Sequence, residues 1–346
     1  MTVYSLDPLQ DPRWSQLVAR HPHGSVFHTR GWLEALERTY GYRPVAFTTC
    51  PPGTELHWAV GFCEIQSWLT GARLVSMPFS DHCDPLTDEA GQLTIVMEHL
   101  ESERKARRWR YIELRPLATD VPADSGFAVS DEYAFHALPL VPDAGSMFRA
   151  FHKSSTQRKI VRAQREGITC EEGRHTGLLR AFYRLLVITR RRHGLPPQPF
   201  AWFSNLAACV GDAMTVRIAS HRGEPVAGIV TIRHGSTMVY KYGASDVRAH
   251  PLGAVHHVFW KAIQDAAAGG CDLLDLGRTD VHERGLSTFK ERWGAKRRSL
   301  CYWRRPVSQR AVPGLDWMAK RGADAARRIP MQLQIAAGRM LYRHLG

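Results

Sequence analysis

The stretch over residues 269–294 places a lysine, an arginine and a conformationally free glycine around the expected end of a strand. The apolar run 273–276 predicts a short strand, which ends in Gly277 and Arg278 before a polar loop leads to Lys290. Ligands of α/β proteins commonly bind where a strand ends in a glycine-rich, charged loop. Cations there can face the oxyanion that develops when an amine attacks an acyl group. Lys290 and Arg278 are therefore candidate catalytic residues that could face a developing oxyanion.

Lys290 directly follows Phe289, and the pair suggests donor binding. The ammonium could stabilise the oxyanion or contact the 3′-terminal phosphates of a tRNA, with the phenylalanine ring packed on a base. The alternative is a surface lysine at the start of a helix. Asp275 and Arg278 flank the strand end, where they could form a structural ion pair, and Gly277 would let Arg278 point into a cleft.

Two tyrosines lie on a strand expected over residues 237–242. Because side chains alternate along a strand, Tyr240 and Tyr242 should share one face. A tyrosine can protonate a leaving group, which makes Tyr242 a further catalytic candidate. The alternative is that both rings pack in the core or at its rim.

A basic helix is expected over residues 154–167. Arg158, Arg162 and Arg165 follow one another at i, i+4 and i+7, so they should lie on one face, with Lys153 at the N-terminus. A helix N-terminus with added cations is suited to anions. We therefore expect substrate binding by Lys153, Arg158 and Arg162, for example of the diphosphate of a nucleotide- or lipid-linked acceptor. The alternative is a solvated charged face.

The loop over residues 77–85 contains two carboxylates that could act on an acceptor amine. Asp81 is a candidate for substrate binding and Asp84 for general-base catalysis, whereas capping of the loop is the usual role of such residues. His82 and Cys83 lack partners at metal-ligand spacing, so no metal site is expected.

Helical and strand patterns alternate along the chain and predict an α/β fold with mixed sheets. In the first half, helices are expected over 25–40 and 89–107, and strands over 43–48, 57–65, 73–77 and 111–114. In the second half, helices are expected over 154–167, 178–192 and 252–268, and strands over 213–220, 226–233, 237–242 and 273–276. A Pro-, Gly- and Asp-containing stretch over 139–145 indicates the junction.

The composition is that of a globular protein with an unusual charge. The 346 residues include 46 Lys and Arg against 33 Asp and Glu, which gives a net charge of +13. Such a field attracts polyanions such as tRNA, CoA or an anionic membrane surface, unless it merely reflects an arginine-rich composition. No transmembrane segment or secretory signal is visible, and seven scattered cysteines form no framework, so we expect a reduced, cytoplasmic protein.

Several motifs together resemble the FemABX-like branch of the GNAT superfamily over roughly residues 20–300. They are Gly24–Phe27 with Trp32, Met77–Asp81, Tyr111–Pro116, Ser154–Gly167, Tyr240–Asp246, and Asp275–Arg278 with Phe289-Lys290 and Trp293-Gly294. The resemblance implies two tandem GNAT-like acyltransferase domains. Residues 1–145 would form the acceptor side and residues 146–305 the acyl-donor side, followed by a basic amphipathic helical tail over 306–346.

The resemblance also implies an N-acyltransferase without a tightly bound cofactor. The best-known members transfer an amino acid from aminoacyl-tRNA to an amine of a peptidoglycan precursor, and others are N-acyltransferases of exopolysaccharide or exosortase systems. This chain lacks the long coiled-coil arm of some members. Its version of the R/Q-x-x-G-x-G/A pyrophosphate loop, from Arg248 to Gly253, is distorted, although both residues are candidates for donor binding. The donor is therefore expected to be aminoacyl-tRNA, with acyl-CoA as the alternative.

The tail is basic and carries apolar residues such as Trp317, Met318 and Leu333. It could lie on an anionic membrane through residues 311–346, at the inner face of the membrane, or pack on its own domain. We expect direct acyl transfer to a small or nucleotide- or lipid-linked amine of the cell envelope, without metal or covalent intermediate. The alternatives are CoA-dependent acylation of an amino sugar, a non-catalytic GNAT-like binding protein and, last, plain nucleic-acid binding.

Overall fold

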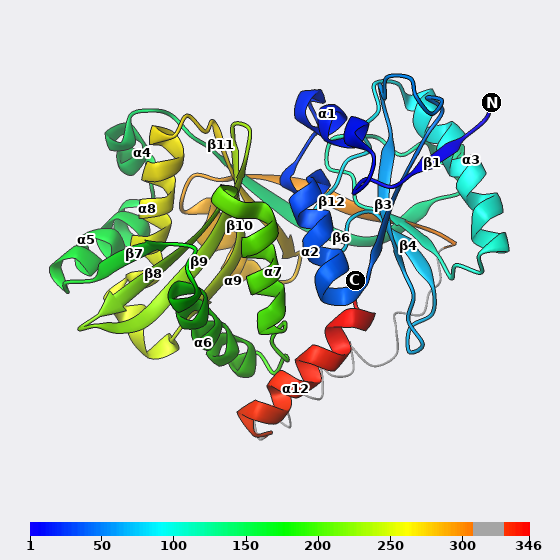
Figure 1. The fold of residues 1–346 in the computed structure, drawn as a ribbon. Helices are drawn as coiled ribbons and strands as arrows, with labels where there is room; N and C mark the ends of the chain where they lie inside the picture. The colour runs from blue at the N-terminus through cyan, green and yellow to red at the C-terminus, as the bar shows by residue number, and fades with distance from the viewer. Residues whose placement is uncertain (307–328) are drawn as a thin grey trace. The chain divides into compact units, whose positions relative to one another are not determined.

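The computed structural model describes residues 1–306 and 329–346, and the chain divides into two compact units (Figure 1). Of the described residues, unit 1 contains 1–133, 299–306 and 340–346, and unit 2 contains 134–298 and 329–339. The units are not sequential blocks, because the chain returns to unit 1 after residue 298. The functional division at residues 145 and 305 stays a prediction.

Neighbouring strands of unit 1 pair antiparallel, with the exception of one parallel pair. β1 to β4 pair in sequence as antiparallel neighbours, β5 is parallel to β4, and β12 is antiparallel to β5. Their bounds are β1 (Tyr4–Leu6), β2 (Arg43–Thr48), β3 (Val60–Ile65), β4 (Arg73–Val75), β5 (Ile112–Leu114) and β12 (Lys296–Arg305). The unit 1 part of β12 begins at residue 299.

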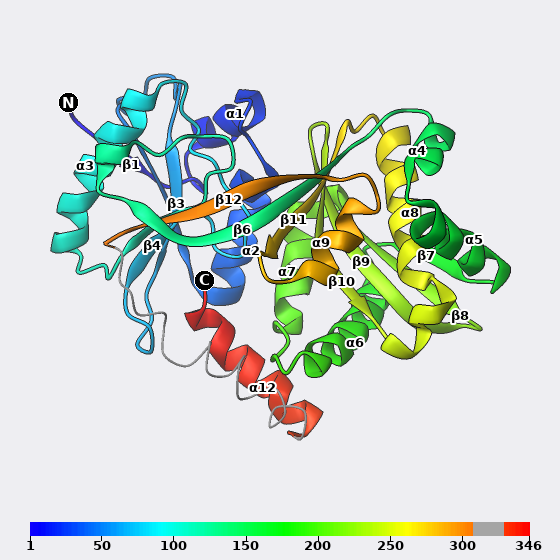
Figure 2. The same cartoon turned by 180° about the vertical axis from the view of Figure 1, so that it is seen from behind.

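Helices α2 and α3 lie on opposite sides of these strands (Figures 1 and 2). α3 packs its apolar residues on Phe62 and Leu74 of the strands. The expected helix over 25–40 is divided, because Thr29 interrupts it with extended backbone and caps α2 through the N–H of Trp32. The helices are α1 (Pro12–Arg20), a 3-10 turn over Val26–His28, α2 (Arg30–Tyr40), α3 (Ala90–Ala106) and a 3-10 turn over Ala123–Ser125. A last 3-10 turn covers Tyr342–His344.

The sheet of unit 2 is mixed. β7, β8, β9 and β10 form an antiparallel meander, and β11 is parallel to β10. The bounds are β6 (Ala128–Pro139), β7 (Thr169–Gly173), β8 (Met214–His221), β9 (Glu224–His234), β10 (Thr237–Ser245) and β11 (Leu273–Asp280). The meander predicted from residue 213 onward is confirmed, whereas β6 and β7 were not predicted.

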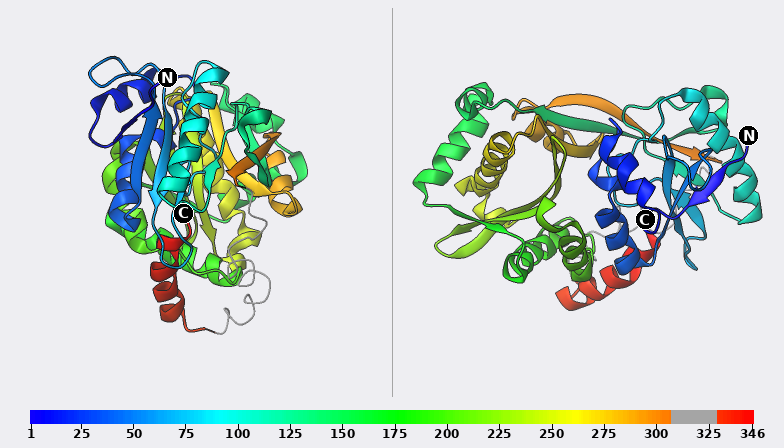
Figure 3. Two further views of the ribbon diagram at one scale, coloured as in Figure 1. Left: turned by 90° about the vertical axis from the view of Figure 1, so that its right-hand side faces the viewer. Right: turned by 45° about the horizontal axis from the view of Figure 1, so that its top comes forward.

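Helix α8 packs on one face of this sheet, and α6 and α7 cover the other (Figure 3). Ala227 and Ile229 of β9 belong to the hydrophobic core that the sheet forms with α8. Phe182 of α6 approaches Gly228 from the opposite face of the sheet. The helices are α4 (Ala144–Ala150), α5 (Arg158–Arg165), α6 (Thr176–Arg192), α7 (Phe200–Val210), α8 (Ala254–Ala268), α9 (Arg284–Glu291) and α12 (Met331–Leu341). Shorter turns cover Lys153–Gln157, which is a π-helix, and Gly211–Ala213 and Val247–Leu252, which are 3-10 helices.

The predicted α/β class with mixed sheets is confirmed. Of the tail predicted over 306–346, α12 belongs to the described part, while Trp317 and Met318 lie outside the described residues. Within residues 1–306 and 329–346, no helix combines the length and apolar character needed to span a bilayer.

Candidate functional site

The candidate site lies where β10 and β11 cease to pair. Their parallel register runs from Thr237↔Leu273 to Val239↔Asp275, although β10 continues to Ser245 and β11 to Asp280. A pocket with a cavity volume of about 310 Å³ opens beside the unpaired part of β10. The sheet therefore provides one wall of a ligand-sized cavity.

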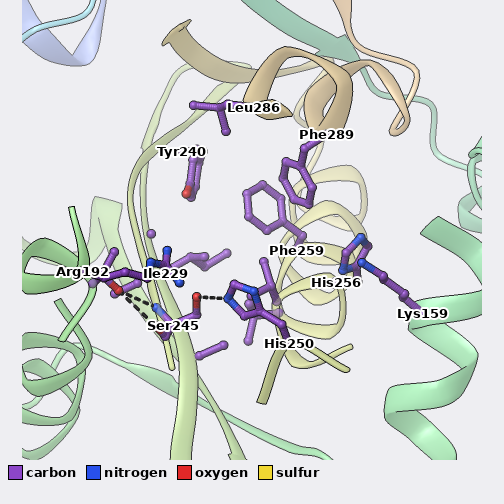
Figure 4. Close-up of a pocket in the computed structure, with 17 residues that line it drawn as sticks. Lys159, Arg192, Ile229, Tyr240, Ser245, His250, His256, Phe259, Leu286 and Phe289 are labelled. Carbon is purple, nitrogen blue, oxygen red and sulfur yellow. Dashed lines mark hydrogen bonds between the residues drawn. The ribbon is translucent and has the colours of Figure 1, made fainter. Parts of the chain in front are cut away.

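The pocket is lined by apolar and by basic side chains (Figure 4). The apolar residues come from three elements and are Ala227, Ile229, Val255, Val258, Phe259, Leu286 and Phe289. The basic residues are Lys159, Arg192, His250 and His256, with Lys159 and Arg192 on opposite sides of the pocket in Figure 4. No aspartate or glutamate in the described part of the chain lines the pocket. An acyl chain can contact the apolar side chains, and an anionic group is attracted to Lys159 and Arg192.

Both histidines of the pocket favour the neutral state. Burial lowers the pKa of His250, and the charges of Arg192 and Lys159 lower it further. Burial is also the main reason that the pKa of His256 falls to about 3, with Lys159 as the next cause. His250 Nε2 lies 2.8 Å from Ser245 Oγ, which fixes its ring. The imidazoles therefore enter the pocket as hydrogen-bonding groups without charge at neutral pH.

The His256 ring is held by aromatic neighbours. It stacks on Trp293 with ring centroids 5.7 Å apart and meets the edge of Phe289 at 5.4 Å. The side chain of Lys159 extends toward it from α5 (Figure 4). His256 belongs to the first turn of α8, where backbone N–H groups have no partner within the helix.

A β-bulge separates the two tyrosines that were expected on one face of the strand. The register of β10 against β9 shifts between Tyr240 and Tyr242, which reverses the alternation of side chains. Tyr240 lines the pocket and packs on Phe259 at 4.6 Å. Tyr242 is buried, and its hydroxyl accepts a hydrogen bond from Trp202 Nε1 at 2.8 Å. The expectation of a shared face is wrong, and the structure places Tyr240 rather than Tyr242 at the pocket.

Lys290 is buried rather than exposed, and it lies near the end of α9. Its Nζ donates to the carbonyl of Gly277 at 2.9 Å, to that of Arg278 at 3.1 Å and to Thr279 Oγ1 at 2.7 Å. These contacts engage the three N–H groups of the ammonium. Lys290 does not line the pocket, and in this structure it secures β11. The alternative of a surface lysine at a helix start is wrong, and the catalytic and donor-binding roles of Lys290 stay predictions.

Gly277 and Arg278 belong to β11, which extends beyond the end predicted at residue 276. Gly277 has φ +68°, a conformation that glycine adopts without strain, and its N–H donates to Asp275 Oδ1 at 2.6 Å. The strand therefore bends at the glycine without ending. Arg278 is half-buried and is not among the residues that line the pocket.

Of the residues predicted to bind the donor, some line the pocket and others do not. Phe289 lines the pocket. Arg248 is exposed and is paired with Asp246, and it is not among the residues that line the pocket. Gly253 precedes α8 with φ +79°, and a Cβ there would meet the carbonyl oxygen of Lys159 at 2.3 Å. Gly253 thus shapes the pocket by allowing the backbones of α5 and α8 to approach.

The basic residues of α5 gather around one groove. Lys153, Arg158, Arg162 and Arg165 line it together with Glu166, and all four cations are exposed. A π-helical turn over Lys153–Gln157 precedes the helix and changes the angular position of Lys153 relative to the arginines. Lys153 nevertheless lines the same groove. Their role in substrate binding stays a prediction.

In unit 1, Asp84 caps a turn of the chain. Its Oδ1 accepts hydrogen bonds from the N–H groups of Leu117, Ala118 and Thr119 at 2.7–3.0 Å. The side chain is thereby engaged in loop capping, the alternative that sequence reasoning had named. Asp81 is half-buried, and its carbonyl oxygen accepts from the hydroxyl of Tyr302 at 2.8 Å.

Sequence reasoning missed four residues of the pocket. Lys159 and Arg192 belonged to basic runs that gave no reason to single them out, and His250 and His256 were seen only as parts of a loop and a helix start. A usable signal was the order Gly253, then His256 within one turn, which places an imidazole at a helix N-terminus.

Comparison with known proteins identifies the domain that contains the pocket. Residues 150–291 match the family model described as an acetyltransferase (GNAT) domain. A UDP-N-acetylmuramoylpentapeptide-lysine N(6)-alanyltransferase from Weissella viridescens is 28% identical over 156 residues, which are 44% of this chain and 46% of that protein. The match thus spans about half the length of this curated relative.

Solved structures extend the similarity of the fold. The crystal structure of FemX superposes with a TM-score of 0.67 at 16% identity and covers 87% of this chain and 97% of its own. A tandem GNAT protein from the clavulanic acid biosynthesis pathway gives a TM-score of 0.54 at 10% identity and covers 90% of this chain and 99% of its own. Residues 150–291 of unit 2 thus match a GNAT acetyltransferase domain, and the fold of the chain is similar to that of FemX and of a tandem GNAT protein.

Proposed function

We propose that this protein is an N-acyltransferase that holds its acyl donor in the pocket beside β10. The observation that carries the proposal is the position and lining of this pocket: it lies within the matched GNAT domain and combines apolar side chains with the cations Lys159 and Arg192. An acyl group and an anionic carrier are the two parts of an activated acyl donor. The pocket offers a suitable surface to each.

The proposed donor is an aminoacyl-tRNA and the acceptor an amine of a cell-envelope precursor. The alanyltransferase relative supports the acceptor and the aminoacyl group, because its name describes transfer of alanine to N6 of the lysine of UDP-N-acetylmuramoylpentapeptide. The net charge of +13 and the basic groove of α5 suit a polynucleotide carrier. The groove and the pocket share α5, which supplies Arg158 to one and Lys159 to the other.

Acyl-CoA is the second candidate, and the charge of the pocket favours it. The α-ammonium of an aminoacyl group would meet Lys159 and Arg192, with no carboxylate of the described residues lining the pocket to offset the repulsion. An acetyl or fatty acyl group carries no such charge. The two candidate donors, aminoacyl-tRNA and acyl-CoA, are distinguished by the experiment below.

The proposed reaction is direct attack by the acceptor amine on the acyl carbon. The C–N bond forms, the C–O bond of the ester or the C–S bond of the thioester breaks, and a proton of the amine passes to the leaving oxygen or sulfur. His256 and Tyr240 line the pocket and could donate hydrogen bonds to the acyl carbonyl. Neither a metal nor a covalent enzyme intermediate is part of this proposal.

The location at the inner face of the membrane and contact through residues 311–346 stay predictions, and much of that segment lies outside the described residues. The cytoplasmic location likewise stays a prediction.

The test compares two donors with a common acceptor. Purified full-length protein is incubated with alanyl-tRNA or with acetyl-CoA, hydroxylamine serves as the amine, and the loss of acyl group from the donor is measured. Arg192→Ala removes a cation from the pocket, and Arg180→Ala, an exposed position on the same helix, is the matched control.

Faster deacylation of alanyl-tRNA, sensitive to Arg192→Ala and insensitive to Arg180→Ala, supports the aminoacyl-tRNA proposal. The same pattern with acetyl-CoA alone replaces it with the CoA-dependent one. If the protein accelerates neither reaction but binds one donor through Arg192, the non-catalytic binding protein becomes the correct description.

A further inference from the structure

The turn between β3 and β4 presents the most exposed aromatic side chain of the described residues. Trp68 is 83% exposed and Leu69 beside it is 50% exposed. Every other tryptophan of the described part of the chain is buried or half-buried. Trp68 and Leu69 together expose adjacent apolar surface of the kind that membranes and partner proteins contact.

The turn is a well-ordered element. The N–H of Gly71 donates to the Ser67 carbonyl at 2.8 Å, and the N–H of Thr70 donates to Ser67 Oγ at 2.8 Å. Trp68 is therefore displayed by a closed hydrogen-bonded loop and not by an open segment.

The C-terminal turn of the chain supports this loop from within unit 1. His344 Nδ1 lies 2.9 Å from Ser67 Oγ, the His344 carbonyl accepts from Thr70 Oγ1 at 2.9 Å, and the His344 ring meets the edge of Trp68 at 5.4 Å. Trp68 and Leu69 form the apolar part of a surface that we call the Trp68 patch.

Arginines surround the apolar part of the patch. Arg110 is exposed and donates from Nη1 to the Thr70 carbonyl at 3.0 Å, and Arg343 directly precedes His344. Neither has an ion-pair partner within the described ranges 1–306 and 329–346. The segments 65–76 and 340–346, which build the patch, contain no aspartate or glutamate.

We propose that the Trp68 patch docks unit 1 onto the surface of an anionic bilayer. Trp68 and Leu69 would enter the headgroup layer, where the amphipathic indole is favoured, while Arg110 and Arg343 contact lipid phosphates. A second copy of the chain is a poor occupant, since a symmetric contact would bring the arginines of both patches together. The proposal concerns a surface of unit 1 and is independent of the donor.

Vesicle binding of the full-length protein tests the proposal. Vesicles of 30% phosphatidylglycerol in phosphatidylcholine are compared with pure phosphatidylcholine, by co-sedimentation. We expect binding to the anionic vesicles, weakened at least ten-fold by the double variant Trp68→Ser with Leu69→Ser, and about five-fold by each of Arg110→Gln and Arg343→Gln. The matched control is Val129→Ser with Val141→Ser, which removes two valines of 45% and 46% exposure and should leave binding unchanged.

The depth of Trp68 is a second measurement. Brominated phosphatidylglycerol should quench part of the tryptophan fluorescence of the wild type, and the same lipid should not quench Trp68→Phe, which keeps an apolar ring and most of the binding. Persistent quenching in that variant would move the contact to another tryptophan and overturn the assignment.

The proposal is also overturned if the protein ignores anionic vesicles, or if the patch and control variants bind them equally. A dimer in sedimentation velocity that Trp68→Ser dissociates would show that a second copy covers the patch. All of these readouts are separate from deacylation, so the donor proposal and the membrane proposal can fail independently.

Discussion

The Lys290 ammonium donates a hydrogen bond of 2.7 Å to Thr279 Oγ1, and both side chains are almost completely buried. The carbonyl oxygens of Gly277 and Arg278 also accept hydrogen bonds from this ammonium, so Lys290 is the donor to three acceptors. We expect Lys290→Met to lower the free energy of unfolding by about 2 kcal/mol, because buried acceptors lose their donor. Urea unfolding measures the loss, with the exposed Lys296→Met as the control. Equal stability of both variants would contradict the buried role.

The hydroxyls of Tyr240 and Tyr242 should differ in their effects. Tyr242→Phe leaves buried Trp202 Nε1 without its acceptor, so we expect a loss of about 1–2 kcal/mol in stability and normal donor binding in the folded fraction. Tyr240→Phe should change donor affinity and leave stability nearly unaltered, because that residue lines the pocket. Thermal unfolding and donor titration on both variants check this. A loss of turnover only in Tyr242→Phe would restore that residue as the catalytic acid.

Gly243 leaves room for the Tyr240 hydroxyl, and an alanine would remove that room. A Cβ at this position would meet the Tyr240 oxygen at 1.9 Å, so Gly243→Ala must displace the tyrosine ring within the pocket. We expect donor affinity to fall by roughly ten-fold, which corresponds to about 1.4 kcal/mol. Gly285→Ala, where the Cβ meets nothing within 4 Å, is the matched control. Unchanged affinity in Gly243→Ala would place the donor elsewhere.

Stability should decrease in mild acid because of His256. The pKa of an imidazole is about 6.5 in the unfolded chain. Burial lowers the pKa of His256 to about 3 in the folded protein. Between these values the unfolded state binds more protons, so the free energy of unfolding falls as the pH falls below 6.5, by up to about 1.4 kcal/mol per pH unit for this one group.

Replacing this imidazole isolates its contribution. His256→Phe keeps an aromatic ring against Trp293 and should flatten the dependence of unfolding free energy on pH, by about one proton near pH 5 and by about a quarter of a proton at pH 7. The exposed His282→Phe is the control. Urea unfolding at pH 5, 6 and 7 measures the slopes, and identical slopes in the wild type and His256→Phe would refute the assignment.

Asp84 should contribute to stability through its three backbone donors. Asp84→Ala leaves the N–H groups of residues 117–119 without an acceptor, and we expect a loss of about 2–3 kcal/mol. Asp84→Asn keeps one oxygen and should lose less. Thermal unfolding ranks the two variants, and a large loss of turnover in a fully stable Asp84→Asn would instead support general-base catalysis.

Much of the framework could be predicted because its signals are local. The meander of β8, β9 and β10 follows from alternating side chains and turn residues, and α8 follows from its apolar period. β7 escaped because its sequence, Thr169–Gly173, is largely polar and exposed and has no apolar face. The end of β11 was predicted too early, at residue 276, because a glycine often interrupts a strand. In the structure β11 continues through Gly277, where Asp275 and Lys290 form hydrogen bonds with the backbone.

The pocket itself could not be predicted, because its residues meet only through the fold. Lys159, Arg192 and His250 come from separate elements, and nothing in the local pattern distinguishes them from the other cations of a basic chain. Tyr240 lines the pocket in place of Tyr242 because of one β-bulge, which places the side chains of residues 240 and 242 on opposite faces of the strand. Asp84 depends on partners more than 30 residues away along the chain.

The short helix α5 contributes to two surfaces at once, with Lys159 at the pocket and Arg158 and Arg162 at the outer groove. Its backbone also touches the start of α8 so closely that only a glycine fits at residue 253. Substitutions in these eight residues are therefore pleiotropic. Under the proposed function, the reactive end and the carrier end of the donor cannot be adjusted separately, so divergence in donor preference should appear as correlated changes in α5 and the first turn of α8.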